Sequence, residues 1–282
     1  MTNFEKRLYL PINMEMIILE LNEVKEIQKV SYEILLEIDR ICKKNDIAYM
    51  LVAGTALGAI RHKGFIPWDD DLDIGMTRDD YNRFIQALKK DLSPDYYFHC
   101  FETDCKYNVV IPQMKIRKRN TYIKEVNFLL KNKCLGDGLF VDVFVYDHIS
   151  EKKWMNNLFR CYMYPYAYLL MLLDNLGLNP ILLKKGFVNS AIWFSRKNKN
   201  SKMWGYSMTW VFSKLSRQHE YKEEDLFPYI KHPFEEGYFP LPHNPDAFLK
   251  IEIGEDYMTP PPISKQVPKH TVEYSLTSDH PH

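Results

Sequence analysis

The sequence lacks several features that assign a chain to a common class. Lys plus Arg equals Asp plus Glu at 37 each, so no overall field draws the chain to nucleic acid or to an anionic membrane. The 5 cysteines form no CxxC pair and no zinc-type spacing, which is typical of reduced thiols in a cytosolic protein. The start, MTNFEKRLYLPINMEM, has no basic end followed by an apolar run, so it does not indicate a signal peptide. These absences favour a cytoplasmic location and no nucleic-acid partner.

Long apolar runs and the best-known catalytic motifs are also missing. The longest uncharged apolar run, residues 161–173, is shorter than the roughly 20 residues that span a bilayer. It predicts a buried helix or a peripheral contact at the inner face of the membrane. The sequence has no GxxxxGK[ST], GxGxxG, GxSxG or HExxH motif, which excludes the nucleotide-binding and hydrolase classes that those motifs define.

The residues that are present indicate a globular chain that alternates helices and strands. With 46% hydrophobic residues over 282 positions, one large domain or a main domain with an appended one can form. Helical spacing of apolar residues predicts a helix at 21–42, and the apolar run 47–53 predicts a strand that leads into Gly54. A second strand, LDIGM, precedes a helix that begins after Thr77, with Asp80 in the capping position.

Further strands and two long helices follow. The stretches YYFHCF, NVVIPQMKIRKRNTYI and GLFVDVFVYD are rich in β-branched and aromatic residues and predict a mixed sheet. Helices are expected at about 151–177, 182–198 and 246–253. We therefore predict an α/β (α+β) fold with a catalytic core at 20–150 and a helical and irregular C-terminal region at 151–282, packed on the core.

Four aspartates crowd the stretch WDDDLDIG and need a compensating cation or water. If DLDI is a strand, its alternation places Asp71 and Asp73 on one face, while Leu72 and Ile74 enter the core. Two carboxylates about 7 Å apart along a strand can hold Mg²⁺ or Mn²⁺ together with phosphate oxygens. The alternative is an acidic loop that caps the next helix. Asp69 and Asp70 are expected only to support the site.

The turn before these aspartates has residues suited to phosphate. Gly54 lets backbone amides approach a phosphate without a Cβ in the way, and Thr55 adds a hydroxyl at the start of a short helix. That helix runs to Arg61, whose guanidinium suits bidentate phosphate binding. An ordinary strand-to-helix turn is the alternative for Gly54 and Thr55.

This order of strand, glycine turn, helix and Asp-x-Asp strand resembles the nucleotidyltransferase fold. More specifically, AGTALGAIRHKGFIPWDDDLDIGMTRDDYNRF resembles the signature of the LicD family, phosphorylcholine transferases related to the fukutin-related proteins. The resemblance covers about residues 20–147, and Ala53 stands where many members have glycine. It implies metal-dependent transfer of phosphocholine, or a related phospho-alcohol, from CDP-choline or a similar CDP-alcohol donor. The implied acceptor is a hydroxyl of a surface glycan precursor of lipopolysaccharide, teichoic acid or capsule type.

Three residues further along the chain complete the predicted site. Asp142 in LFVDVF is flanked by apolar residues, and we predict that it is a third metal ligand or the base for the acceptor hydroxyl. A buried Asp that fixes the sheet is the alternative. Lys115, Arg117 and Arg119 alternate along one face of KIRKRNTYI. The first two are predicted to bind the diphosphate or an anionic glycan, and the alternative is a solvated edge strand.

Other functions remain open from the sequence. A nucleotidyltransferase would move the nucleoside monophosphate itself, and a GT-A sugar transferase would place a nucleotide-binding β-α-β stretch before its DxD. A non-catalytic binding protein that kept the fold is a third possibility, although it would not require Gly54, Asp71 and Asp73 together.

Overall fold

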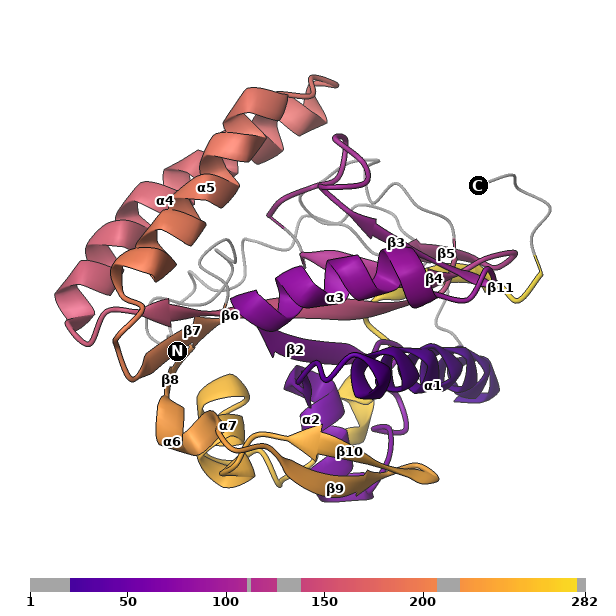
Figure 1. Cartoon of the computed structure of the whole chain (residues 1–282). Helices are drawn as coiled ribbons and strands as arrows, with labels where there is room; N and C mark the ends of the chain where they lie inside the picture. Colours follow the sequence, from indigo (N-terminus) through magenta and orange to yellow (C-terminus); the bar gives the residue numbers. More distant parts are fainter. Residues whose placement is uncertain (1–20, 111–112, 126–137, 207–218, 278–282) are drawn as a thin grey trace, which may run out of the picture.

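A mixed β-sheet forms the centre of the molecule (Figure 1). The computed structural model describes residues 21–110, 113–125, 138–206 and 219–277. Within them, five strands lie in the order β1 (Met50–Leu51), β2 (Asp73–Thr77), β6 (Phe140–Ile149), β4 (Met114–Lys118) and β3 (Tyr96–Cys100). β7 (Met203–Tyr206) pairs with β6 and with β8 (Glu220–Lys222), while β2 and β6 run parallel. This mixed sheet confirms the predicted α/β (α+β) class.

Two amphipathic helices contact each other and the central strands. α1 (Leu21–Lys44) buries Val24, Ile27, Ile34, Ile38 and Ile41 of the stripe that the helical spacing predicted, but its first member, Leu21, is exposed at the start of the helix. α3 (Arg78–Asp91) begins after Thr77, whose hydroxyl accepts from the Asp80 amide at 3.2 Å, so the predicted cap is confirmed. Both helices contact β6, and their buried faces form the main core with the sheet.

The segments around β1 form a second group of elements. α2 (Ala53–His62) packs against β2, α7 (Pro245–Glu252) and the hairpin of β9 (Ile230–Phe234) and β10 (Gly237–Leu241). A separate two-stranded sheet joins β5 (Tyr122–Glu125) to β11 (Thr271–Ser275), so the C-terminal segment returns to the N-terminal half (Figure 1). A short helix α6 (Glu223–Leu226) and a 3-10 turn (Ile263–Lys265) complete the described elements.

The long helices α4 (Lys153–Asn175) and α5 (Ile181–Lys197) form a hairpin, close to the two ranges expected from the sequence. Their facing sides build a smaller core of their own, which includes Phe159, Met163 and Phe187. None of the helices in the described ranges is both long enough and apolar enough to cross a membrane.

Two predictions about strands need correction. The strand expected at 47–53 is only the two-residue β1, because α2 already begins at Ala53. The solvated edge strand considered for KIRKRNTYI is wrong, because β4 lies between β6 and β3, and Lys115 and Arg117 are buried. The domain division at residue 150 stays a prediction. Strands β7 and β8, which follow it, belong to the same sheet as the predicted core.

Candidate functional site

The strand register places three predicted site residues in one row. Asp73 on β2 is the direct partner of Asp142 on β6, and Asp142 is the direct partner of Lys115 on β4. Side chains of directly paired residues point to the same face of a sheet. The strands thus place two carboxylates and an ammonium group side by side, although these residues lie far apart in the sequence. Leu72 and Ile74 are fully buried, as the alternation predicted.

Lys115 and Arg117 are buried cations at this row. Lys115 Nζ lies 2.9 Å from Asp142 Oδ1 and 2.9 Å from Glu125 Oε1, and 3.3 Å from the centre of the Phe140 ring. Arg117 donates to the Gly138 carbonyl at 2.8 Å and lies 3.8 Å from Glu125. In a buried environment such charges need partners, and Glu125 on β5 provides one that the sequence reading did not name.

The carboxylates crowd one another. Burial raises the pKa of Asp73 well above its usual range, and Asp71, Asp142 and Asp69 raise it further. Burial raises the pKa of Asp142 to about 6, although Lys115 acts in the opposite direction. The pKa values of Asp69 and Asp71 are also raised, first by burial. More negative charge gathers here than the neighbouring side chains neutralise.

The pKa of Glu125 is shifted in the opposite direction from those of the aspartates. Burial acts to raise its pKa, but Lys115 and then Arg117 outweigh that effect, so the pKa of Glu125 lies below its ordinary value. Glu125 is therefore an ionised partner of the two buried cations, and it balances charge that would otherwise face Asp142 alone.

The turn at Gly54 brings the first half of the site against the aspartates. A Cβ on Gly54 would lie 2.6 Å from Asp69 Oδ2, so the glycine makes room for this carboxylate. The Thr55 hydroxyl accepts from the Asp73 amide at 2.8 Å and thereby fixes the start of β2. Arg61 donates to the Tyr257 carbonyl at 2.9 Å, and burial lowers its pKa while Asp69 acts to raise it. Ala53 has a φ of 48°, a conformation that glycine adopts without strain.

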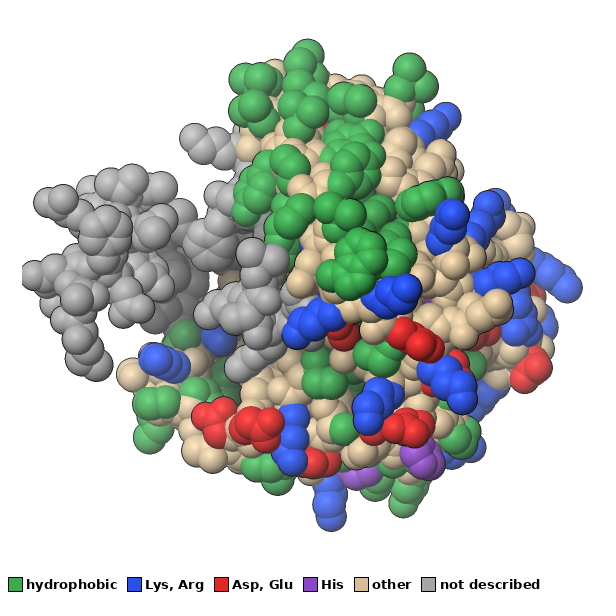
Figure 2. All heavy atoms as spheres, turned by 90° about the vertical axis from the view of Figure 1, so that its left-hand side faces the viewer, with side chains coloured by type: hydrophobic (Ala, Val, Ile, Leu, Met, Phe, Trp, Pro, Cys, Tyr) green, Lys and Arg blue, Asp and Glu red, His purple; other side chains and the backbone are tan. Residues whose placement is uncertain are grey.

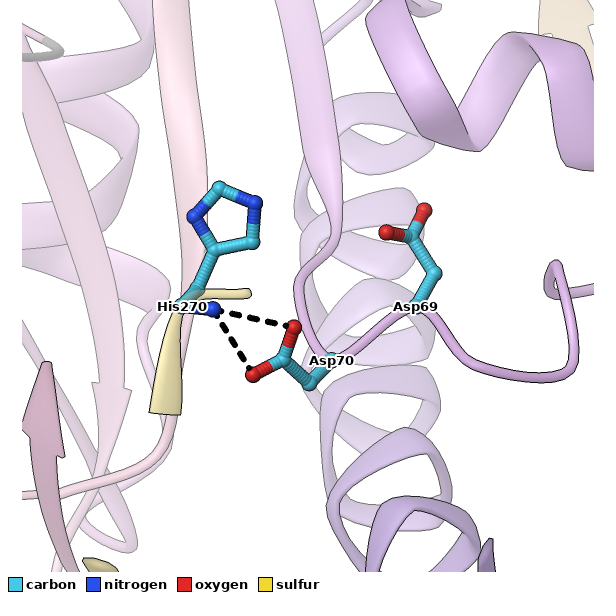
Figure 3. A group of neighbouring side chains, drawn as sticks. All are labelled: Asp69, Asp70 and His270. Carbon is cyan, nitrogen blue, oxygen red and sulfur yellow. Dashed lines mark hydrogen bonds between the residues drawn. The ribbon is translucent and has the colours of Figure 1, made fainter. Parts of the chain in front are cut away.

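Asp70 has a structural role that the sequence did not reveal. Its carboxylate accepts from the amides of Lys269, His270 and Thr271, at distances of 2.6 to 3.3 Å. Figure 3 shows this carboxylate facing the backbone nitrogen of His270, while the imidazole ring extends away from the contact. Asp70 thus holds the start of β11 against the site.

The same contact brings the ring of His270 to the aspartates. Its Nε2 lies 3.3 Å from Asp71 Oδ2. Among the described residues, the metal-type ligand atoms that gather within 4.8 Å of one another belong to Asp69, Asp70 and His270. The predicted trio of Asp71, Asp73 and Asp142 is not gathered that closely, and its role as the metal site stays a prediction.

The donor set nevertheless suits a hard divalent cation. Asp69, Asp71, Asp73 and Asp142 offer carboxylate oxygens, the ligands that Mg²⁺ and Mn²⁺ prefer. Their pKa values are raised because the carboxylates are buried among like charges. A bound cation would neutralise that repulsion. The residues present therefore fit the cation that the resemblance implies.

The part of the chain that contains most of these residues is similar to known proteins. Residues 46–169 match a family described as LicD/FKTN/FKRP, nucleotidyltransferase domain. This part of the chain is similar to the nucleotidyltransferase domain of that family. The lipopolysaccharide cholinephosphotransferase LicD of Haemophilus influenzae is 35% identical over 129 residues, which are 46% of this chain and 46% of that protein. The resemblance stated from the sequence is thereby confirmed.

Two further relatives have no described function. An uncharacterized protein of Rickettsia prowazekii is 32% identical over 120 residues, 42% of each chain. An uncharacterized protein of Rickettsia typhi is 46% identical over 57 residues, 20% of this chain and 18% of that protein. The chain thus aligns with less than half the length of these relatives.

The matched domain, residues 46–169, contains Gly54, Thr55, Arg61 and the predicted carboxylates, but not the whole site. His270 and the segment that Asp70 holds lie outside residues 46–169. Asp147 lies inside the domain, but it forms a buried ion pair with Arg78, which ties β6 to the start of α3. The described residues before Gly54 form α1 and β1 and not the β-α-β stretch of a GT-A transferase.

Proposed function

We propose that this chain transfers phosphocholine, or a related phospho-alcohol, from a CDP-alcohol donor to a hydroxyl of a cell-surface glycan precursor. The observation that carries the proposal is the row of Asp73, Asp142 and Lys115 across three strands of a LicD-family domain. The name of the Haemophilus influenzae relative, a lipopolysaccharide cholinephosphotransferase, supports choline as the alcohol and lipopolysaccharide as the class of acceptor. Teichoic acid and capsule precursors belong to the same class of hydroxyl acceptor.

Asp71, Asp73 and Asp142 are the residues that we propose to hold Mg²⁺ or Mn²⁺. When bound, the cation supplies neutralisation of phosphate charge and orientation of the reacting oxygens, which are the main requirements of phosphoryl transfer. Asp142 lies beside Lys115, where it can complete the metal ligands or accept the proton of the acceptor hydroxyl.

The phosphate-binding residues of the proposal lie on and around α2. The amides at Gly54 and the Thr55 hydroxyl lie at the start of this helix, where backbone N–H groups attract anions. Arg61 lies in its last turn, and its guanidinium is fixed by the Tyr257 carbonyl. Two further residues of the proposal lie on β4: Lys115, beside Asp142, and Arg117, beside Glu125, add positive charge that is proposed to attract the diphosphate of the donor.

The proposed reaction takes place in the cytoplasm. Cys42 and Cys100 are free thiols buried in the core, and reduced thiols are typical of cytoplasmic proteins. The donor and the glycan precursor are the proposed partners, and nucleic acid is not among them.

A product assay with a panel of CDP-alcohols tests the proposal. Purified protein is incubated with CDP-choline, CDP-ethanolamine or CTP, with Mg²⁺, Mn²⁺ or EDTA, and the nucleotide products are identified. We expect release of CMP from a CDP-alcohol that depends on the metal. Release of pyrophosphate from CTP would instead support a nucleotidyltransferase, and no metal-dependent product would favour a binding protein.

Two variants and a matched control make the assay specific for the site. Asp73→Asn and Asp142→Asn should each lower the rate by at least about a hundredfold, because each removes charge at the reacting phosphate. Asp46→Asn is the control, since Asp46 is exposed and its φ of 52° is one that Asn also adopts. Full activity in the two site variants would remove Asp73 and Asp142 from the catalytic role.

A further inference from the structure

The α4–α5 hairpin carries a large exposed apolar surface that the proposed site does not use. Figure 2 shows hydrophobic side chains gathered over the upper part of this face of the molecule. Large exposed apolar side chains occur along α4, at the turn between the helices and on α5. We call this surface the outer face, and its main members are Trp154, Leu158, Leu172, Leu176, Leu182 and Trp193. Apolar patches of this extent on soluble proteins mark interaction sites.

On α4 the exposed apolar residues form a continuous stripe. Apart from Cys161 and Tyr168, they recur at positions 154, 158, 162, 165, 169 and 172, and at 176 just past the end of the helix. At 3.6 residues per turn these positions fall within roughly 80° of one another around the helix. The opposite side of α4 carries Phe159, Met163, Ala167 and Leu170, which pack in the smaller core. The helix is therefore apolar on both sides. One side is packed in the smaller core, while the other is mostly exposed, with Tyr162 at its edge hydrogen-bonded to Ser190 of α5.

Positive charge accompanies the outer face. Within residues 151–202, all of which the structure describes, the exposed charged side chains are Glu151 and a set of basic residues. That set is Lys152, Lys153, Lys185, Arg196, Lys197, Lys199 and Lys202. Six of the seven lie near the end of the hairpin where α4 begins and α5 finishes, since only Lys185 lies near the other end of α5. In Figure 2, Lys and Arg side chains border the hydrophobic surface.

A hollow opens between the two helices at the outer face. It has a volume of about 620 Å³ and is lined by Trp154, Leu158, Phe159, Tyr162, Trp193 and Phe194, among others. Asn189 and Ser190 provide polar groups at its wall. Such a hollow gives a hydrocarbon chain a place to lie between α4 and α5.

We propose that the outer face docks this protein on an anionic lipid bilayer. The apolar stripe would lie at the boundary of headgroups and acyl chains, and the basic residues would meet the lipid phosphates. Trp154 and Trp193 are the residue type that favours this boundary, because an indole has an apolar body and one polar N–H group. The chain as a whole has a net charge of +0, so the attraction comes from this local set of basic residues.

The charge pattern favours lipid over a second copy of the chain. Two copies that met through their outer faces would give the basic sets no opposite charge in either orientation, because the exposed acidic side chain of residues 151–202 is Glu151 alone, and parallel hairpins would bring the like charges together. An anionic bilayer instead provides opposite charge around an apolar interior, which is the pattern that the outer face complements.

Vesicle co-sedimentation with the full chain tests the proposal. The vesicles contain phosphatidylethanolamine and phosphatidylglycerol, or phosphatidylcholine alone, and no donor or metal is added, so the result does not depend on the transferase activity. We expect binding to the anionic vesicles that weakens with salt, and at least about tenfold weaker binding to the neutral vesicles. Binding to neither kind, or equal binding to both, would overturn the proposal.

Matched serine variants locate the binding surface. Leu158→Ser with Leu176→Ser changes side chains that are 64% and 66% exposed on the outer face. Tyr238→Ser with Ile263→Ser changes side chains that are 66% and 85% exposed elsewhere. We expect the first pair to weaken vesicle binding at least about tenfold and the second pair to leave it unchanged. Equal effects of the two pairs would contradict the proposal.

Light scattering and thermal unfolding distinguish lipid binding from two other uses of the outer face. If the outer face were the contact between two copies, wild type would be a dimer and Leu158→Ser with Leu176→Ser would be a monomer. If a segment of this chain covered the face, the same pair would lower the melting temperature without any vesicle binding by wild type. Should that pair fail to fold, Leu182→Ser at the hairpin end replaces it, with Ile263→Ser as its control.

Discussion

At the scale of single residues, the buried aspartates lower the stability of the metal-free fold and provide ligands for a cation. Asp73 has a raised pKa because it is buried and because three other carboxylates lie near it. An ionised carboxylate in such a place opposes folding, since the unfolded chain exposes it to water. Functional sites often retain a cost of this kind.

Asp73→Asn should therefore stabilise the metal-free protein. We expect its free energy of unfolding to increase by about 1 kcal/mol, because the substitution removes one of the repelling charges. Urea unfolding in the presence of EDTA measures this, with Asp46→Asn as the control for loss of an exposed aspartate. A destabilised Asp73→Asn protein would mean that the carboxylate makes favourable contacts and that the cluster is not strained by repulsion.

The same two variants and wild type test metal binding without an activity assay. Mg²⁺ or Mn²⁺ should raise the melting temperature of wild type and of Asp46→Asn, because a ligand that binds the folded state stabilises it. The rise should be much smaller for Asp73→Asn. An equal rise in all three proteins would place the bound cation away from Asp73.

Gly54 provides a second test at the residue scale. Gly54→Ala should cost about 1 to 3 kcal/mol of stability, because the added Cβ would lie 2.6 Å from Asp69 Oδ2 and force this carboxylate to move. The double variant Gly54→Ala with Asp69→Ala should recover most of that loss relative to Asp69→Ala alone. If the double variant shows the full additional loss, the cost comes from the backbone at Gly54 and not from Asp69.

At the scale of elements, the C-terminal strand β11 depends on one distant carboxylate. Asp70 accepts from three consecutive amides at the start of β11, and β11 pairs with β5, which carries Glu125. An amide side chain in place of Asp70 would lose one acceptor oxygen and all of its charge.

Asp70→Asn should loosen β11 while the central sheet stays intact. Losing a charge-assisted hydrogen bond costs about 1 to 3 kcal/mol, so the amides of Lys269, His270 and Thr271 should exchange at least about tenfold faster with solvent deuterium. Hydrogen exchange followed by mass spectrometry measures this, with peptides of β2 and β6 as the internal reference. Unchanged exchange at these three amides would show that pairing with β5 alone holds the strand.

Local patterns predicted the elements that depend on neighbours in the chain. The stripe of α1 and the Thr77 cap of α3 follow from residues three or four positions apart, and both are confirmed. The position of β4 was not predictable in this way. Alternation identified Lys115 and Arg117 as a row, but whether a strand lies at an edge depends on the order of strands that are distant in the sequence.

At the scale of the whole molecule, the candidate site is assembled from both halves of the chain. The apolar flanks of Asp142 suggested it as a third carboxylate, but its pairing with Asp73 was not predicted, because no local pattern fixes which strands run side by side. The contributions of Glu125 and of residues 269–271 were missed for the same reason. One signal for them is present in the sequence: the DDD run has more carboxylates than two metal ligands require. That signal did not identify the distant segment that Asp70 holds.

The central claim is that a phospho-alcohol, and not a nucleotide, moves to the acceptor. Slow hydrolysis of CDP-choline by the purified protein in oxygen-18 water tests it directly, since water then stands in for the acceptor hydroxyl. Mass spectrometry of the two products shows which phosphorus was attacked. We predict heavy oxygen in the phosphocholine and none in the CMP, whereas heavy oxygen in the CMP would contradict the claim.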